Sequence, residues 1–171
     1  VFTFYRQLYP VLADQLFGGG AGTVGLLTSA NALGSVAGSL AMLFLTRYRH
    51  TGRIVLWATA VYGLALFPFA LVGSLPVGLL LIATLGGMDA ISVTARQLTV
   101  QLTTPDAMRG RALSIQTLAA QTANNIGTLE VGLASGLIGA TRTLLLGATV
   151  AVAITGFAWR RVRALSDYEA P

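Results

Sequence analysis

The residues of this sequence that could do chemistry are ionisable side chains set within long apolar stretches. Asp89 and Arg96 stand seven positions apart, which places both on one face of a helix. Glu130 and Arg6 lie in two other apolar stretches. A charged group in such surroundings is costly, so it is usually paired, turned to water or functional. These side-chain types could hold a counter-ion, exchange a proton or bind a charged solute.

A second polar group is rich in amides. Gln121, Asn124 and Asn125 share one helix face with smaller polar residues spaced by three and four positions. Those smaller residues are Ser114, Thr117, Thr128 and Gly132. The opposite face carries Ile and Leu, and buried amides need partners, so the polar face must meet protein or water. We expect it to line a cavity or a domain interface, and helix packing through small polar residues is the alternative.

Two further stripes follow the same spacing. One comprises Thr28, Asn31, Ser35, Gly38 and Ser39, and the other comprises Asp89, Ser92, Arg96, Thr99 and Thr103. The first stripe consists mostly of small residues, for which close helix packing is the expected role. We predict the same role for the pairs Gly34-x-x-x-Gly38 and Gly132-x-x-x-Gly136.

The sequence lacks the arrangements typical of enzymes. It contains no cysteine, and its one histidine, His50, stands among arginines, so no metal-ligand set is predicted. No Ser/His/acid set with plausible spacing, no phosphate-binding loop and no pair of His ligands occurs. We therefore expect a protein that is not an enzyme and that binds no cofactor or metal.

The elements that position these residues are long apolar helices. Hydrophobic residues make up 54% of the 171 residues and charged residues only 10%, too few for the charged shell of a soluble domain. About 20 mostly apolar residues cross a bilayer as a helix. The predicted spans are 23–45, 54–72, 77–103, 112–138 and 144–159, with a truncated span at 1–17. The predicted fold class is all-α, a polytopic transmembrane helix bundle, and we expect a piece of a longer protein because Val1 opens inside an apolar stretch.

The arginines are distributed unevenly between the connectors. Arg142 stands alone on one side, and eight arginines stand on the other: Arg47, Arg49, Arg53, Arg109, Arg111, Arg160, Arg161 and Arg163. Such a bias marks the cytoplasmic side of a membrane protein rather than a nucleic-acid surface. We therefore expect a multi-pass membrane protein with a cytoplasmic tail at 160–171. In the connector, Thr104 is predicted to cap the next helix and Pro105 and Asp106 to begin it.

The order of the segments indicates transport. Two polar-faced helices and one apolar helix follow each other twice, a repeat of three helices that is typical of secondary transporters. Asp89 lies about 20 Å below the outer end of its helix, where it could bind a proton or a substrate cation, or form a structural ion pair. Glu130 lies about 18 Å from Asp89 in depth, so we predict no direct pair between them.

The other charged residues have two readings each. Arg96 is expected to pair with the inner end of a neighbouring helix or to reach the headgroups. Glu130 could gate the outer mouth or simply be solvated. Arg6 could bind a substrate anion or belong to helix packing.

Three motifs resemble major facilitator superfamily transporters, and most of all the bacterial transmembrane secretion effectors similar to enterobactin exporters. These motifs are Gly86-Gly87-Met88-Asp89 through Arg96-Gln97, the connector Thr104-Pro105-Asp106-Ala107-Met108-Arg109-Gly110-Arg111, and Asn-x-x-Gly-x-x-Glu-x-Gly at Asn124–Gly132. The resemblance implies two halves of six helices each, of which this chain is the C-terminal one and the N-terminal half is its partner. It also implies that the first and fourth segments line the cavity, the second and fifth meet the other half, and the third and sixth face lipid.

The sequence departs from that family pattern at several acids. The connector at Arg47 and Arg53 keeps its basic residues and loses the usual Asp, and Asn125 and Ala107 stand where relatives often carry Glu. The resemblance implies proton-driven export of a small organic molecule such as a siderophore or drug. Import of a nutrient, and a membrane scaffold or sensor that does not transport, are the alternatives; Asp89 and the amide-rich face disfavour a scaffold. A channel is disfavoured because no repeated filter residues occur.

Overall fold

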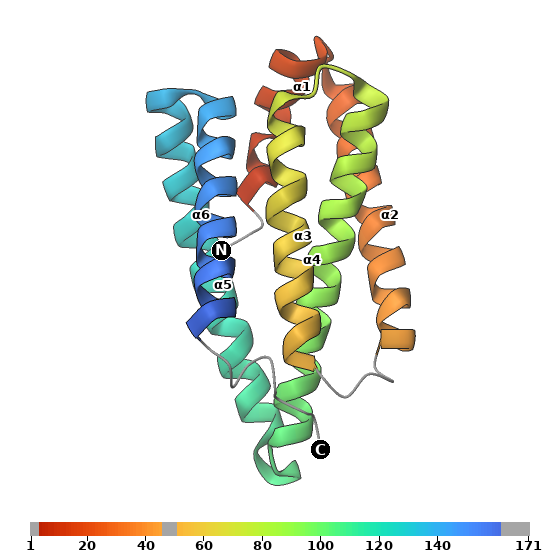
Figure 1. The fold of residues 1–171 in the computed structure, drawn as a ribbon, viewed down its shortest axis with the longest axis vertical. Coiled ribbons are helices and arrows are strands. Elements are labelled where there is room, and N and C mark those ends of the chain that lie inside the picture. Colours follow the sequence, from red (N-terminus) through yellow and green to blue (C-terminus); the bar gives the residue numbers. More distant parts are fainter. Residues whose placement is uncertain (1–3, 46–50, 162–171) are drawn as a thin grey trace.

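The structure is a computed structural model that describes residues 4–45 and 51–161. The chain begins with a short 3₁₀ turn, η1 (Phe4–Leu8), which leads into α1 (Tyr9–Phe17). Five long helices follow: α2 (Ala21–Leu45), α3 (Thr51–Leu71), α4 (Leu75–Thr103), α5 (Asp106–Ile138) and α6 (Ala140–Arg161). The long helices run side by side along the longest axis of the molecule (Figure 1). The described residues form helices and connectors without a strand, which confirms the predicted all-α class.

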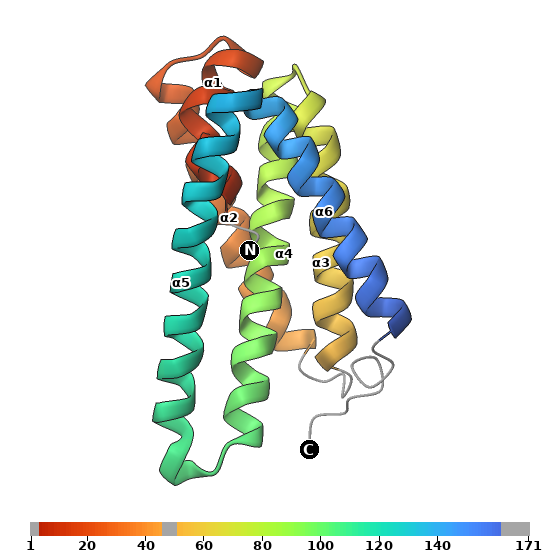
Figure 2. The ribbon, with the colours of Figure 1, turned by 90° about the vertical axis from the view of Figure 1, so that its left-hand side faces the viewer.

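Four helices are long and apolar enough to cross a membrane, namely those at Ala21–Leu45, Gly52–Leu71, Leu75–Thr103 and Ala140–Phe157. The fifth predicted span, 112–138, lies within α5, but α5 is too polar to belong to this set. Its amide face and its charged first turns lower its hydropathy. At 33 residues α5 is about 50 Å long, more than the roughly 30 Å of a hydrocarbon core. With α4 it extends beyond the other helices at one end of the bundle (Figure 2).

Some helices are longer than predicted, because they include polar residues that the sequence pattern assigns to connectors. α5 begins at Asp106 rather than at 112, and α6 runs from Ala140 to Arg161 rather than over 144–159. The predicted capping by Thr104 is wrong: Thr104 closes α4, and Pro105 occupies the N-cap of α5 without a side-chain hydrogen bond. Asp106 lies in the first turn of α5, as predicted.

The chain turns sharply between α1 and α2 at a glycine. Gly18 adopts a left-handed conformation, with φ at 57°, and its N–H donates to the carbonyl of Asp14 at 3.1 Å. The next N–H, of Gly19, donates to the carbonyl of Ala13 at 2.9 Å. This arrangement satisfies carbonyls that would otherwise be unpaired at a helix end. It returns the chain along the bundle, so that α1 lies against α2.

The helices α2 and α4 pack most closely, through glycines. A Cβ atom on Gly38 would lie 2.8 Å from the Cα of Gly87, and one on Gly34 would lie 2.7 Å from the Cα of Ala83. Small residues let two helix backbones approach in this way. The close-packing role predicted for Gly34 and Gly38 is therefore confirmed. The same role predicted for Gly132 and Gly136 is wrong within the described residues, because a Cβ atom on either would meet nothing within 4 Å.

Two apolar clusters fill the bundle. The larger lies toward the end that holds the α1–α2 turn, and its largest fully buried side chains are Leu12, Leu27, Phe69, Ile82 and Leu85. The smaller joins the other halves of α2, α3 and α4. α3 and α6 bury one face and expose apolar side chains on the other: Trp57, Leu64, Leu71, Leu146, Val150, Ile154 and Phe157.

The described arginines of the connectors lie at the two ends of the bundle, as the sequence pattern predicts. Arg109 and Arg111 lie in the first turns of α5, at the end where α4 and α5 meet. Arg53 lies in the first turn of α3, which starts at that end (Figure 2). Arg142 lies at the opposite end, in the first turn of α6. Arg47 and the tail from 162 onward lie outside the described residues.

Candidate functional site

An ion pair links the first segment of the chain to the middle of α4. Nη2 of Arg6, in η1, lies 3.3 Å from Oδ2 of Asp89. Asp89 stands midway along α4, and its side chain is 16% exposed, whereas that of Arg6 is 40% exposed. The pair therefore lies far from either end of the bundle with one open side. A charge at such depth needs a counter-charge or water, and here it has the counter-charge.

Three tyrosines and an amide surround this ion pair on the inner side. Tyr5, Tyr9 and Tyr62 are all at least 96% buried, and Tyr5 stacks edge to face with the other two at ring-centre distances of 5.8 and 5.9 Å. Nδ2 of Asn31, on α2, donates a hydrogen bond of 2.5 Å to the hydroxyl oxygen of Tyr5. These side chains come from η1, α1, α2 and α3, so the cluster ties four elements together. We call these four residues, with Arg6 and Asp89, the central polar cluster.

The glycine contact between α2 and α4 holds Asn31 in this cluster. A Cβ atom on Gly86 would overlap the carbonyl of Asn31, so only glycine permits this approach. The hydroxyl of Ser35 lies within reach of two carbonyls, that of Asn31 at 3.0 Å and that of Gly86 at 3.2 Å. The stripe predicted on α2 thus splits: Asn31, Ser35 and Gly38 pack inward, whereas Thr28 and Ser39 are exposed.

The structure does not bring the other predicted charged residues into the cluster. Arg96 is exposed on α4, and its Nε donates to the carbonyl of Ser92 in the same helix at 3.1 Å. Glu130 is exposed on α5 and is not joined to Asp89, whose ion-pair partner among the described residues is Arg6. The pairing of Arg6 with Asp89 is the arrangement that the sequence did not predict.

The amide-rich face of α5 lies largely open. Gln121 and Asn125 are exposed, Asn124 is partly buried, and the hydroxyl of Thr128 donates to the carbonyl of Asn124 at 2.9 Å. The apolar residues of α5 are exposed as well, for example Leu129 at 69%. η1, which carries Arg6, lies against this helix. α5 therefore offers a polar surface next to the central polar cluster without filling it.

The predicted connector residues form an exposed ion pair at the arginine-rich end. Nη2 of Arg109 lies 2.5 Å from Oδ1 of Asp106, one turn earlier in α5, and Nε of Arg109 donates to the carbonyl of Gln101 at 3.0 Å. Arg109 thereby joins the first turn of α5 to the last turn of α4. Arg53 and Arg111 are exposed at the same end. These contacts shape the connector and lie far along α4 from Asp89.

The described residues contain no group of three or more His, Cys, Asp or Glu side chains that could hold a metal ion. The central polar cluster has one acid, one base, three phenols and one amide. That set can exchange a proton at the carboxylate, bind a charged group by releasing Arg6 or Asp89, and stack aromatic rings. These are the chemical properties of a solute-binding or proton-exchanging site.

Sequence reasoning missed the tyrosines. Tyr5 and Tyr9 stand four positions apart and so share one helix face, a signal that could have been read. Tyr62 lies in a segment that is almost wholly apolar, where it is not part of a polar stripe. Its burial becomes visible only when α3 is packed against α4 and the ring of Tyr62 meets that of Tyr5 in η1.

Comparison with known proteins finds one matching protein family and several similar proteins. A family model described as transmembrane secretion effector matches residues 5–170. Enterobactin exporters of Escherichia coli O81 (strain ED1a), Escherichia coli O139:H28 and Shigella boydii serotype 18 are each 32% identical to it over 127 residues, or 74% of this chain. The matched part is 30% of the length of those relatives. No solved structure matches the chain.

Proposed function

Because this chain belongs to the transmembrane secretion effector family of the major facilitator superfamily, we propose that it forms the C-terminal half of a secondary active exporter. The observation that carries this proposal is the Arg6–Asp89 ion pair midway along the helices. A membrane scaffold has no need of a charge at that depth, whereas a transporter uses such groups to couple ions to solute movement. The similarity to enterobactin exporters supports export of a small organic molecule, such as a siderophore or drug.

Proton coupling is proposed to act through Asp89. A proton that binds the carboxylate neutralises it and removes the electrostatic attraction that holds Arg6. A cationic group of the solute can bind the ionised carboxylate in place of Arg6, but it cannot bind the protonated one. A proton and a solute would therefore occupy Asp89 at different times. Each cycle would thus exchange one proton for one solute at Asp89.

The exposed polar face of α5 is proposed to meet the N-terminal half of the same transporter. Gln121 and Asn125 would be costly against lipid, and the relatives extend well beyond the part that this chain matches. The arginine-rich end is proposed to be cytoplasmic, in the inner membrane of a bacterium, with the C-terminal tail on that side. In this arrangement the outward apolar faces of α3 and α6 would contact lipid.

Transport by the full-length protein in everted membrane vesicles tests this proposal. In such vesicles an exporter accumulates its solute, so a panel of labelled siderophores and drugs is added with and without an imposed proton gradient. We expect accumulation of at least one compound that requires the gradient. We expect the Asp89→Asn variant to lose both gradient-driven accumulation and exchange of labelled for unlabelled solute, because the proton and the solute share this carboxylate.

Asp14→Asn is the matched control, since Asp14 is an exposed acid on α1 outside the central polar cluster. It should transport as the parent protein does. Normal gradient-driven accumulation by Asp89→Asn would refute the proton step. Accumulation only in right-side-out vesicles would show that the protein imports its solute. Failure of the protein to accumulate any compound of the panel would favour the scaffold alternative.

A further inference from the structure

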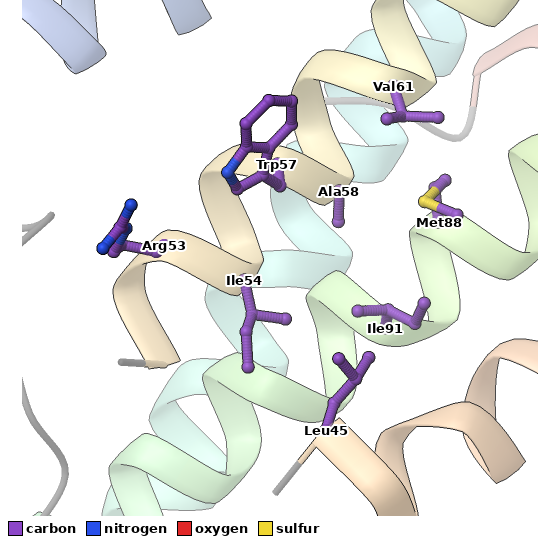
Figure 3. A pocket seen from close by; sticks show the side chains of 8 residues that line it. All are labelled: Leu45, Arg53, Ile54, Trp57, Ala58, Val61, Met88 and Ile91. Atoms are coloured by element: carbon purple, nitrogen blue, oxygen red, sulfur yellow. The ribbon is translucent and has the colours of Figure 1, made fainter. Parts of the chain in front are cut away.

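An apolar groove with a volume of ≈ 430 Å³ lies between α2, α3 and α4, apart from the central polar cluster. Its floor is formed by Ala58 and Ile91, which are 3% and 7% exposed and belong to the smaller apolar cluster of the bundle. Ile54 and Val61 of α3 form one wall, and Met88 of α4 faces them (Figure 3). The volume lies in the range of small-molecule sites.

One end of the groove is positively charged. Arg53 lies there, in the first turn of α3, with an exposed side chain. The unpaired N–H groups of a helix start add to the attraction for an anion. Trp57, one turn further along and 57% exposed, also lines the groove at this end (Figure 3). Tryptophan is typical of the interface between hydrocarbon and headgroups.

The groove has the length of one leaflet. Arg53 and Val61 are eight positions apart on α3, or about 12 Å at 1.5 Å per residue. Half of the hydrocarbon core is about 15 Å thick. Met88 precedes Asp89, which stands midway along α4. The groove therefore runs from the arginine-rich end of the bundle to about the middle of the membrane.

We infer that this groove binds an anionic phospholipid, with one acyl chain along the groove and the phosphate at Arg53. The side chains that line it beyond Arg53 and Trp57 are all aliphatic or Met. They offer nothing that would orient a polar solute, whereas a long apolar chain needs only contact. Among the described residues that line the groove, Arg53 is the one cation, and its charge complements that of a phosphate. The occupant is thus apolar over most of its length and anionic at one end.

Fluorescence of Trp57 in the full-length protein tests this inference. Every other tryptophan, including Trp159, is replaced by Phe, and the protein is reconstituted in bilayers of phosphatidylcholine and phosphatidylglycerol. In parallel samples one lipid or the other carries brominated chains, which quench Trp57 on contact. The ratio of the two association constants at Trp57 is the measurement. We expect a preference of about fivefold for phosphatidylglycerol, the factor that one basic residue near the membrane surface contributes.

Two variants connect that preference to the groove. Arg53→Gln should bring the ratio to about one, since the charge at the mouth is lost. Arg111→Gln is the matched control, because Arg111 is exposed at the same end and does not line the groove, and it should keep the preference. Val61→Phe should reduce quenching by brominated chains of either lipid, because it fills the groove.

Three results would overturn the inference. One is equal quenching by the two lipids in the parent protein. Another is a fivefold preference that survives Arg53→Gln. The third is competitive relief of quenching by a transported solute, which would assign the groove to that solute. The first two results do not depend on transport, so the inference can fail while the proposed export stands.

Discussion

The contact between α2 and α4 makes a specific prediction for Gly34→Ala. A Cβ atom there would lie 2.7 Å from the Cα of Ala83, whereas carbon atoms rest about 3.5–4.0 Å apart. The three nearest atoms all belong to the backbone of Ala83, so no side chain can rotate away. The carbonyl oxygen of Ala83 would lie closer still, so the two helices must separate by more than about 1 Å along this contact.

The expected result is a lower free energy of unfolding. Overpacking of this kind costs about 1–3 kcal/mol, and the fixed backbone favours the upper end of that range. Alanine gains up to about 1 kcal/mol over glycine in a helix interior. The difference predicts a net loss of about 2 kcal/mol for Gly34→Ala. Titration of the purified full-length protein with a denaturing detergent, followed by its helical circular dichroism, measures this quantity.

Two comparisons make the test decisive. Gly147→Ala, in the interior of α6 with nothing within 4 Å of its Cβ position, should be neutral or up to about 1 kcal/mol more stable. The double variant Gly34→Ala/Ala83→Gly should be no more stable than Gly34→Ala, because the clash is with backbone. The reasoning is refuted if Gly34→Ala is as stable as Gly147→Ala, or if removing the side chain of Ala83 restores stability.

Three further predictions concern polar contacts. Tyr5→Phe leaves the buried amide of Asn31 without its acceptor and should lower the free energy of unfolding by about 1–3 kcal/mol; equal stability in the same titration would contradict it. Replacing only Arg6 by Gln should destabilise the protein more than replacing both Arg6 by Gln and Asp89 by Asn, since the single variant leaves an uncompensated charge; a double-mutant cycle measures this coupling. Asp106→Asn should change stability by less than about 1 kcal/mol, because its side chain is 87% exposed, and a larger loss would show that its ion pair matters.

The helices themselves could be predicted from the sequence because a membrane span is recognised by its length and apolar composition. The element bounds were less accurate at α5, where the charged first turns looked like a connector. Helix formation there rests on backbone hydrogen bonds, which need no apolar sequence. Hydropathy predicts where a helix meets lipid, not where it begins.

The candidate site was predicted in part. The apolar surroundings of Asp89 and Arg6 marked both as unusual, because an isolated charge in a span is costly. Their pairing could not be predicted, since it depends on the turn at Gly18 and on how α1 lies across the bundle. The two glycine pairs show the same limit of prediction from sequence. Their spacing is identical, but Gly34 packs closely against α4, whereas Gly132 faces open space.

The ion pair also sets an order for assembly in the membrane. Arg6 and Asp89 are 83 positions apart in the chain. At about 5–20 residues per second, the ribosome makes Asp89 about 4–17 s after Arg6. During that delay the guanidinium cannot pair with Asp89. The contact between η1 and α4 therefore forms only after α4 has been made, and the part of the described chain that is synthesised first is among the last to complete its contacts.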